Sequence, residues 1–284
     1  MVNVIAQYLI HCKTTILCER DCSMFRKLFL PIAVGLGVFA LIKSKKRKEL
    51  PLIGDKAPSF TAQSTKGLIH FPRDYKGHWV IFFSHPADFT PVCTTEFMHF
   101  EALNNEFEKL NTKLLGLSVD SVSSHLAWLK NIREKIDFDG MSDIDVNFPL
   151  IDDLNRSIAK KYGMIQPKAD STKTVRAVFI IDPTSKIRAV LYYPQTNGRN
   201  LEEIKRLLIA LQTTDAFEVV TTANWELGDD VIITPPANKE DAIHRLESMD
   251  DTRCYDWFLC FKNLSKESIN ERLICSDTSN NSLN

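Results

Sequence analysis

Residues 84–96 of the chain read Ser-His-Pro-Ala-Asp-Phe-Thr-Pro-Val-Cys-Thr-Thr-Glu, and their flanks predict the local architecture. Immediately before them, Trp79–Phe83 is a short apolar, aromatic and branched run that is typical of a buried strand. After them, apolar side chains recur at helical spacing from Thr94 to Leu110, with polar residues between them. Cys93 is therefore predicted to lie where a strand has ended and a helix begins.

This position favours chemistry at Cys93. A helix N-terminus presents free backbone N–H groups and the positive end of the helix dipole, which favour the nucleophilic thiolate form of a cysteine. Pro86 and Pro91 stiffen the approach, and the Thr90 hydroxyl can donate or accept a hydrogen bond next to the sulfur. The alternative is a small buried hydrophobe, the commonest role of a free cysteine, but the Pro/Thr-rich turn argues against it.

The pattern Pro86-x-x-x-Thr90-x-x-Cys93 resembles the active-site signature of the peroxiredoxins. His85 before the proline and Thr94 after the cysteine are similar to the one-cysteine members of that family. The resemblance implies an antioxidant thiol peroxidase that reduces hydrogen peroxide and organic hydroperoxides through a Cys93 sulfenic acid. It implies no cofactor, an external thiol for which the family suggests glutathione, and a glutathione transferase as a candidate partner.

The resemblance also indicates further site residues. Arg176, in Thr174-Val-Arg-Ala-Val-Phe179, matches the family's active-site arginine, whose planar guanidinium would hold the thiolate charge and polarise the O–O bond. The alternative is an edge-strand arginine that faces water. Thr90 is expected to hydrogen-bond the peroxide and the thiolate. His85 is either a structural histidine or a group beside the sulfur, and Glu96 either caps the first helical turn or pairs with Arg176.

The sequence lacks the residues that metal binding and phospholipid hydrolysis would need. Asp120, Asp152 and Asp153 are predicted to be surface or capping acids, because no histidine stands at metal-ligand spacing from them. Some one-cysteine peroxiredoxins also hydrolyse phospholipids through the serine of a Gly-x-Ser-x-Gly motif. Here residues 76–80 read Lys-Gly-His-Trp-Val, with His78 at the position of that serine. We therefore expect neither a metal site nor a phospholipase activity.

The composition is that of a globular protein with a sizeable core. Of its 284 residues, 44% are hydrophobic and 25% charged, with a net charge of −1. The charge is uneven, because residues 1–50 carry nine Lys and Arg against three Asp and Glu, a net of +6, which leaves −7 for the remainder. A mildly acidic body argues against a nucleic-acid partner, and a basic N-terminus is typical of targeting segments.

Of the seven cysteines, only Cys93 lies in the central body. This favours a reducing compartment and a reactive thiol over a disulfide-stapled secreted domain. One alternative is a two-cysteine peroxiredoxin in which Cys254, Cys260 or Cys275 resolves the sulfenic acid, although their spacing fits no resolving motif of the family. Another alternative is a non-catalytic redox sensor or scaffold with the same fold, against which the complete motif argues.

A hydrophobic segment precedes the globular pattern. Residues 28–42 are uncharged and almost wholly apolar, and a strongly basic run, residues 43–48, follows them. As a helix they would span about 22 Å, short of the ~30 Å hydrocarbon core unless their flanks extend it. We predict a membrane anchor with the body in the cytosol, at the mitochondrial outer membrane or the endoplasmic reticulum. The alternatives are a buried helix or a cleaved segment that leaves a soluble cytosolic or mitochondrial protein.

The predicted fold class is α/β, a thioredoxin-like fold with a C-terminal peroxiredoxin extension, preceded by the short hydrophobic N-terminal segment. The predicted boundaries are 1–50 for the targeting or anchor segment, 51–214 for the peroxidase domain, 215–245 for the dimerisation arm and 246–284 for a divergent, partly disordered tail. The arm segment Asn224–Asp230 resembles the part of the family that helps to build the dimer, which implies a homodimer. After the first strand and helix, strands are expected at Lys113–Asp120, Phe148–Ile151, Val175–Ile181 and Ile187–Tyr193, and helices at Ser123–Lys130, Asp153–Tyr162 and Asn200–Thr213.

Overall fold

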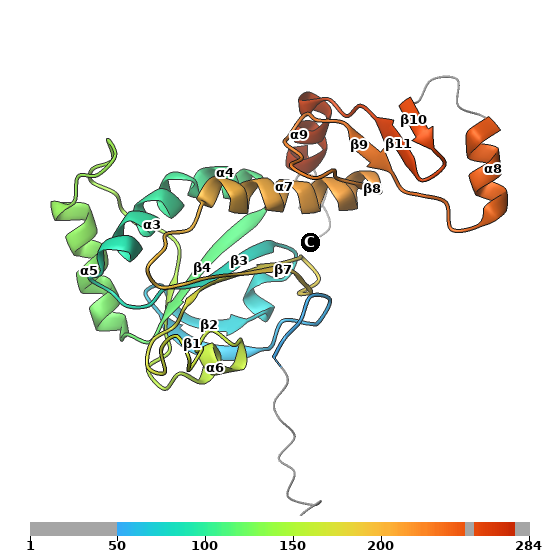
Figure 1. Cartoon of the computed structure of the whole chain (residues 1–284). Coiled ribbons are helices and arrows are strands. Elements are labelled where there is room, and N and C mark those ends of the chain that lie inside the picture. Colours follow the sequence, from blue (N-terminus) through green and yellow to red (C-terminus); the bar gives the residue numbers. More distant parts are fainter. Residues whose placement is uncertain (1–49, 248–252, 276–284) are drawn as a thin grey trace, which may run out of the picture. The chain divides into compact units, whose positions relative to one another are not determined.

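The computed structural model describes residues 50–247 and 253–275, and Figure 1 shows their arrangement. The hydrophobic segment 28–42 lies outside these residues. Within the described ranges no helix is long and apolar enough to cross a membrane. In chain order the elements are β1 (Phe60–Ser64), β2 (Gly67–Phe71), η1 (Arg73–Tyr75), β3 (Trp79–Ser84), α3 (Pro91–Ala102), α4 (Asn104–Lys109), β4 (Thr112–Ser118), α5 (Val122–Lys135), β5 (Leu150–Asp152), α6 (Ser157–Lys161), β6 (Arg176–Ile181), β7 (Ile187–Tyr193), α7 (Leu201–Phe217), β8 (Val219–Val220), β9 (Val231–Ile233), α8 (Lys239–Glu247), β10 (Arg253–Asp256), β11 (Leu259–Lys262) and α9 (Lys266–Cys275).

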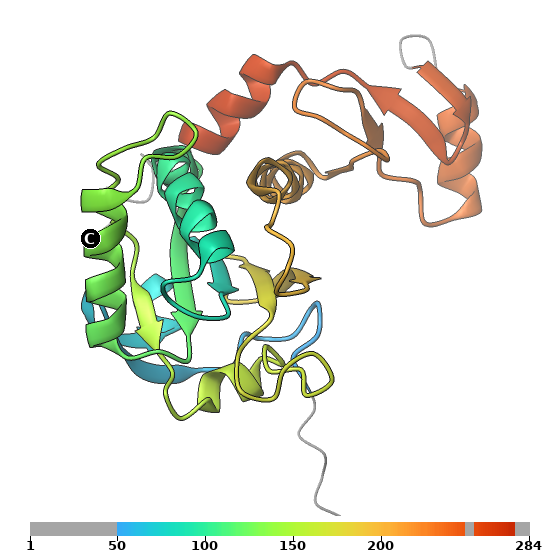
Figure 2. The same cartoon turned by 60° about the vertical axis from the view of Figure 1, so that its left-hand side comes forward.

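A seven-stranded mixed sheet forms the body, with the strand order β2-β1-β5-β4-β3-β6-β7. β3 runs parallel to β4 and antiparallel to β6, so parallel and antiparallel pairing meet at this strand. All six residues of β3 are buried, as its continuous apolar sequence predicts for a strand covered on both faces. Figures 1 and 2 show helices on either side of this sheet.

The side chains of β3 alternate between two hydrophobic clusters. Trp79, Ile81 and Phe83 belong to the cluster that includes residues of α3, α5 and α7, and Val80 and Phe82 belong to the cluster with the β1–β2 hairpin and α6. Burying a side chain of this size contributes about 1.5–3 kcal/mol, so both faces of the strand hold the fold together. A mixed sheet with helices on both faces agrees with the predicted thioredoxin-like α/β class.

The helices differ from their predicted spans. α5 continues to Lys135 and α7 to Phe217, five and four residues beyond the predicted ends. The helix expected up to Leu110 is interrupted at Leu103, where α3 ends and α4 begins. Asn104 and Asn105 follow the break, and asparagine side chains compete with the backbone for hydrogen bonds in a helix interior. α6 begins only at Ser157, because the Asp153 carboxylate accepts hydrogen bonds from the backbone of Ile158 and Ala159 and so caps a later start.

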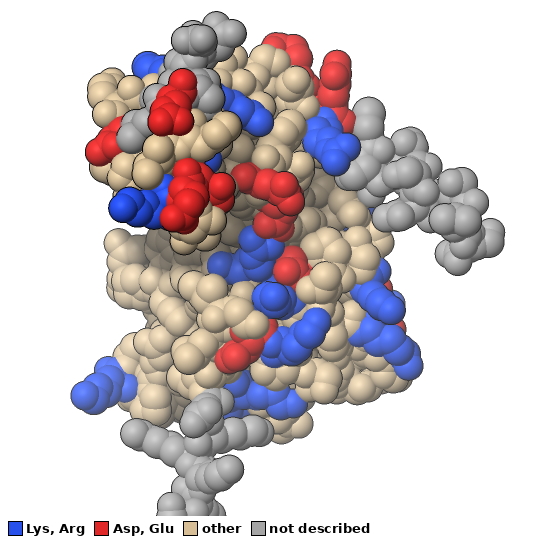
Figure 3. All heavy atoms as spheres, turned by 90° about the vertical axis from the view of Figure 1, so that its right-hand side faces the viewer, with Lys and Arg blue, Asp and Glu red and all other residues tan. Residues whose placement is uncertain are grey.

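The C-terminal extension contains a second sheet, with the order β10-β11-β9-β8. α9 follows it, and its buried side chains Ile269 and Leu273 join the same cluster as α7. Residues 253–275, which fall in the region predicted to be partly disordered, thus form two strands and a helix. Cys260, Leu264, Ile269 and Leu273 are buried, whereas the aromatic side chains of residues 255, 257 and 258 at the hairpin tip are exposed. On the face in Figure 3, basic and acidic side chains lie among one another, so this face shows no single-sign patch of the kind that attracts a polyanion.

Candidate active site

The end of β3 and the start of β6 are tied together by side-chain hydrogen bonds. The Ser84 hydroxyl donates to the carbonyl of Val175 over 2.7 Å and accepts from the N–H of Ala177 over 3.2 Å. The Thr174 hydroxyl donates to the carbonyl of His85 over 2.6 Å. These bonds hold the loop that leaves β3 against the strand that carries Arg176. Residues almost a hundred positions apart in sequence therefore meet at one point.

α3 begins inside the motif, as the sequence predicts. Thr90 is the N-cap residue with an extended backbone, Pro91 occupies the first helical turn, and Cys93 follows with its side chain fully buried. The Thr90 hydroxyl donates to the carbonyl of Ala87 over 2.8 Å, and the Thr90 carbonyl accepts from Thr94. The hydroxyl proton of Thr90 is thus used within the loop, and the lone pairs of its oxygen are what it can offer to a ligand.

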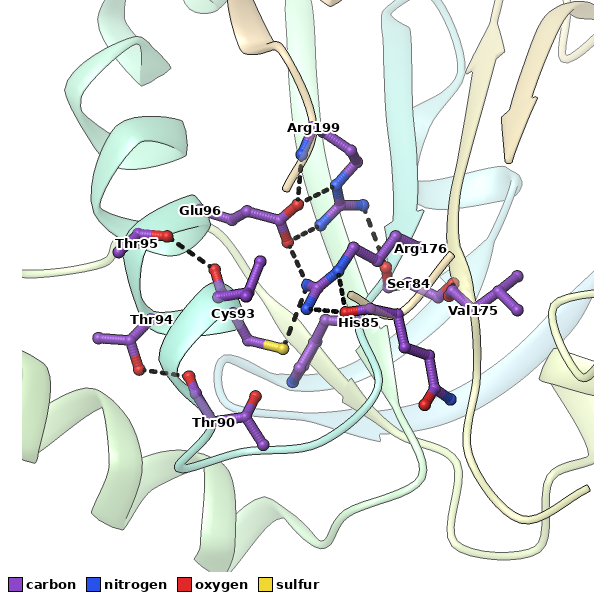
Figure 4. Close-up of polar contacts among 12 residues, drawn as sticks. Ser84, His85, Thr90, Cys93, Thr94, Thr95, Glu96, Val175, Arg176 and Arg199 are labelled. Atoms are coloured by element: carbon purple, nitrogen blue, oxygen red, sulfur yellow. Dashed lines mark hydrogen bonds and ion pairs between the residues drawn. The ribbon is translucent and has the colours of Figure 1, made fainter. Parts of the chain in front are cut away.

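Arg176 contacts both Cys93 and Glu96 (Figure 4). Its Nη1 donates to Cys93 Sγ over 3.3 Å and to Glu96 Oε2 over 2.7 Å. Its Nε and Nη2 donate to the carbonyl of Gln195 over 3.1 and 2.8 Å, which fixes the plane of the guanidinium. The side chain is only 2% exposed, so the alternative of an edge-strand arginine in water does not apply. A cation held in this way stabilises negative charge on the sulfur.

A second arginine, Arg199, completes the support of Glu96. Its backbone N–H and Nε donate to Glu96 Oε1 over 2.8 and 2.9 Å, and its Nη2 donates to Oε2 over 2.6 Å. Nη1 donates to the carbonyl of Ser84, and the guanidinium lies over the rings of Phe83 and Phe100 at 5.1 and 5.2 Å. Glu96 therefore pairs with two arginines, which decides between the two predicted roles in favour of pairing over helix capping.

The charge state of Glu96 follows from this environment. Burial by itself raises the pKa of the carboxyl, but Arg199 and then Arg176 outweigh it and hold the pKa below its ordinary value. Because the folded-state pKa is lowered, the carboxylate contributes stability above the ordinary carboxyl range and loses that contribution as the pH falls through the lowered pKa.

A buried network of Asp88 with two histidines lies behind the motif loop. Asp88 Oδ1 is 3.1 Å from His85 Nε2, and Asp88 Oδ2 is 2.9 Å from His125 Nδ1. Burial raises the pKa of Asp88, but the bonds from His125 and His85 hold it well below its usual value. Burial lowers the pKa of His85, against the opposing effect of Asp88.

Hydrogen-bond partners also constrain the two rings. His125 faces the Asp88 carboxylate with Nδ1 and the carbonyl of Ile151 with Nε2, so the ring bridges the motif loop and β5. His85 donates from Nε2, and its buried Nδ1 has no partner among the described residues. The ring packs against Phe97 and Trp128, so His85 is part of a buried network and not a surface residue.

His85, Asp88 and Asp120 bring ligand atoms within 4.8 Å of one another, which is close enough to consider a metal. However, Asp120 Oδ2 already accepts from the Asp88 N–H and the Ser118 hydroxyl, and the Asp88 carboxylate already faces both histidines. These hydrogen bonds already engage Asp120 Oδ2 and both oxygens of Asp88, so we assign no ion to the cluster. Asp152 and Asp153 accept from backbone N–H groups at the starts of α5 and α6, as predicted for capping acids, although Asp153 is buried.

Of the predicted site residues, Cys93, Glu96 and Arg176 are in direct contact, and His85, Pro86 and Thr90 form the loop before the helix. Sequence reasoning did not assign a site role to three further residues. These residues are Asp88, His125 and Arg199. Asp88 lies in the motif, and residues 120–128 and 193–200, which contain the other two, also resemble segments of the family, which is the signal that the sequence offers for them.

Two hollows of about 990 and 500 Å³ lie along α7 and α9. None of the motif residues lines them, and we assign them no substrate. Two of the three tail cysteines are engaged elsewhere, because Cys254 and Cys260 form a disulfide with each other. Cys93 is the free cysteine among the described side chains, so two of the three candidate resolving cysteines are paired away from it.

Comparison with known proteins places this geometry in a family. Residues 53–190 match the AhpC/TSA family, and residues 210–249 match the C-terminal domain of 1-Cys peroxiredoxin. A peroxiredoxin of Methanosarcina mazei is 60% identical over 214 residues, which cover 75% of this chain and 98% of that protein. A peroxiredoxin of Aquifex aeolicus is 49% identical over 225 residues, which cover 76% and 98%.

Comparison with solved structures leads to the same family. A yeast mitochondrial 1-Cys peroxiredoxin, described with a thiol-resolving mechanism through glutathione/thioredoxin systems, matches at a TM-score of 0.66 and 41% identity, over 76% of this chain and 100% of that one. A mutant of peroxiredoxin 6 from Arenicola marina matches at a TM-score of 0.65 and 35% identity, over 75% and 97%. With the Cys93 motif intact and both parts of the family present, the chain belongs to the peroxiredoxin family and is a thiol peroxidase.

Proposed function

We propose that Cys93 is the residue that peroxide oxidises. Its thiolate attacks one oxygen of the peroxide, an S–O bond forms, the O–O bond breaks, and the departing oxygen leaves as water or an alcohol after it takes up a proton. The product on the protein is a Cys93 sulfenic acid. The observation that carries this proposal is the 3.3 Å contact between Arg176 Nη1 and Cys93 Sγ, since a buried cation there favours the attacking anion.

The neighbouring groups support distinct roles. Arg176 has a donor directed at the sulfur, where it would also meet the negative charge that develops on the peroxide oxygens. The Thr90 oxygen would accept a hydrogen bond from the peroxide O–H, because its own proton is already donated to Ala87. Pro86 holds the loop, and Glu96 positions Arg176 without touching the sulfur itself in the described contacts.

We also propose that an external thiol reduces the sulfenic acid, with glutathione as the candidate reductant and a glutathione transferase as a candidate partner. The disulfide between Cys254 and Cys260 supports this, because it leaves neither of these thiols free to attack Cys93. The yeast neighbour, described with glutathione/thioredoxin systems, supports the same class of reductant. Such turnover would serve antioxidant defence and redox homeostasis.

The experiment is peptide mapping by mass spectrometry after one equivalent of peroxide. In the full chain we expect Cys93 as sulfenic acid or, with glutathione present, as a mixed disulfide. The triple variant Cys254→Ser, Cys260→Ser and Cys275→Ser should keep peroxidase turnover with glutathione or dithiothreitol. A stoichiometric disulfide between Cys93 and a tail cysteine, lost together with turnover in the triple variant, would show a two-cysteine mechanism instead.

Arg176→Lys should slow the reaction of the thiolate with peroxide roughly tenfold to hundredfold, measured by rapid mixing. Lysine keeps the charge but loses the planar fork that reaches Cys93, Glu96 and Gln195 together. The matched control is Arg188→Lys, since Arg188 makes a bidentate contact with Asp215 away from Cys93. Equal rate constants for Arg176→Lys and Arg188→Lys would show that Arg176 takes no part in the reaction with peroxide.

A homodimer is part of the proposal. β7 is an edge strand of the large sheet. The backbone of Ile187 is paired with residues 54 and 55, and the outer edge beyond it is available, within the described chain, to a strand of a second copy. The match of residues 210–249 to the 1-Cys C-terminal domain supports the same assembly. Sedimentation equilibrium should give the mass of two chains, and the mass of a single chain would contradict the homodimer.

We propose, from the sequence of residues 28–48, that the N-terminus anchors the protein to a membrane with the catalytic body in the cytosol. The mitochondrial outer membrane and the endoplasmic reticulum are the candidate sites. After carbonate extraction the full chain should remain in the membrane pellet, and a variant that lacks residues 1–48 should be released. A mature protein that begins after residue 48 would show a cleaved targeting segment, and the anchor would be excluded.

A further inference from the structure

Helix α5 contacts the Cys93 motif at two places, through side chains that lie one turn apart. His125 and Trp128 are three positions apart in sequence, which puts them on one face of the helix, and both are buried. His125 Nδ1 lies 2.9 Å from an oxygen of the Asp88 carboxylate, in the loop before Cys93. Trp128 Nε1 donates over 3.2 Å to the hydroxyl of Thr94, the residue directly after Cys93. The helix therefore holds the motif on both sides of the reactive cysteine.

Both contacts lead to Thr90. The Thr94 hydroxyl, which accepts from Trp128, donates its own proton to the carbonyl of Thr90 over 2.9 Å (Figure 4). On the other side, a single residue, Phe89, separates Asp88 from Thr90 along the chain. One contact of α5 thus fixes the carbonyl of Thr90, and the other contact fixes the chain that leads into Thr90.

The backbone between Asp88 and Thr90 depends on such anchors. Phe89 has a positive φ of 53°, a left-handed conformation that is sterically unfavourable for a residue with a Cβ atom. Its side chain is 58% exposed, so burial of the ring contributes little to this conformation. Asp88, in contrast, is buried, its carboxylate faces two histidines, and its backbone N–H donates to Asp120 Oδ2 over 3.0 Å. The unfavourable backbone at Phe89 is therefore held by the neighbours that α5 anchors.

We propose that His125, through Asp88, and Trp128, through Thr94, are positioning residues for the reaction with peroxide. They touch neither the sulfur nor the substrate, and they act by holding the side-chain oxygen of Thr90. This inference rests on the proposed role of Thr90 as the acceptor of the peroxide O–H. A displacement of about 1 Å in an orienting group is enough to slow a reaction roughly hundredfold. The nucleophile has a separate support, because the hydrogen bonds that the guanidinium beside the sulfur makes in the described chain go to residues outside α5.

The test compares two reactions of the same sulfur in the full chain. Peroxide needs the acceptor at Thr90, whereas iodoacetamide alkylates the Cys93 thiolate without one. Rapid quench and peptide mapping give the rate constant of each reaction at Cys93. His125→Leu removes the partner of the Asp88 carboxylate on α5, and Trp128→Phe removes the indole N–H. Each should lower the ratio of the peroxide rate constant to the iodoacetamide rate constant about tenfold.

Two further variants separate positioning from a general loss of stability. In His125→Asn the side-chain amide nitrogen takes the place of Nδ1, so the ratio should stay within about threefold of the wild type. Trp225 is also a buried indole, but its N–H donates to the carbonyl of Asp229, so Trp225→Phe should leave the ratio unchanged. Three results would each overturn the proposal: a wild-type ratio in His125→Leu, a wild-type ratio in Trp128→Phe, and a tenfold fall in Trp225→Phe.

Thr90→Val distinguishes this proposal from the role of Thr90 itself. Valine keeps the branched shape and lacks the oxygen, so the ratio should fall at least about tenfold. A wild-type ratio in Thr90→Val would refute the role of Thr90, and positioning through Thr90 would be refuted with it. If the ratio does fall, the addition of Trp128→Phe should change it less than about twofold, because the indole acts through the oxygen that is now absent. A further tenfold fall in the double variant would show that Trp128 acts by another route, which would overturn the positioning proposal and leave the role of Thr90 intact.

Discussion

Replacement of Cys93 by serine is expected to reduce thiol-dependent peroxide turnover by about three orders of magnitude or more. A serine hydroxyl stays protonated near neutral pH, even beside the guanidinium of Arg176, and oxygen forms no equivalent of a sulfenic acid. The substitution exchanges a buried sulfur for a slightly smaller oxygen at the start of α3, so the fold should remain. Stopped-flow measurement of peroxide consumption with excess glutathione measures the loss.

The matched control is the double variant Cys254→Ser, Cys260→Ser, which makes the same chemical change outside the motif. It should keep turnover, because its cysteines are bonded to each other and lie beyond the peroxidase part of the chain. Circular dichroism of both variants verifies that each is folded. Undiminished turnover in Cys93→Ser would mean that another group reacts with peroxide, and the proposed mechanism would be wrong.

The strand, turn and helix around Cys93 could be predicted because each depends on local sequence. Trp79–Phe83 is apolar without interruption, and a strand with both faces covered needs just that pattern. Thr90 and Pro91 mark the helix start by their own preferences for the cap and first turn. Arg176 was found by resemblance to the family, since an arginine in an apolar strand has no local meaning by itself.

The contacts that hold the residues around Cys93 in place could not be predicted in the same way. Arg199 and Glu96 are 103 residues apart in sequence, and only the folded sheet brings the loop after β7 to the side of α3. The link between Asp88 and His125 likewise spans 37 residues and depends on how α5 packs. The tail hairpin was missed for another reason, because its stability comes from pairing with β9 and not from its own short, weakly patterned strands.

A substitution of Glu96 measures how much these long-range contacts contribute to the stability of the fold. Glu96→Ala is expected to lower the free energy of unfolding by about 3–5 kcal/mol, the usual cost when one partner of a buried ion pair is removed. The reason is that the guanidinium groups of Arg176 and Arg199, with side chains 2% and 0% exposed, would lose the carboxylate that compensates their buried charge. Urea unfolding at neutral pH, followed by fluorescence, measures the change.

Glu106→Ala is the matched control, because Glu106 pairs with Lys205 but its side chain is 53% exposed. An exposed pair contributes about 0–1 kcal/mol, so the control should change stability several times less than Glu96→Ala.

The pH dependence gives an independent check. The wild type should lose stability as the pH falls below 4.5, the ordinary pKa of the carboxyl, because Glu96 must then be protonated against its lowered folded-state pKa. Glu96→Ala lacks that group and should lose less stability over the same pH interval. Two results together would show that Glu96 does not hold the arginines as the geometry implies: parallel pH profiles of the wild type and Glu96→Ala, and equal losses of stability in Glu96→Ala and Glu106→Ala at neutral pH.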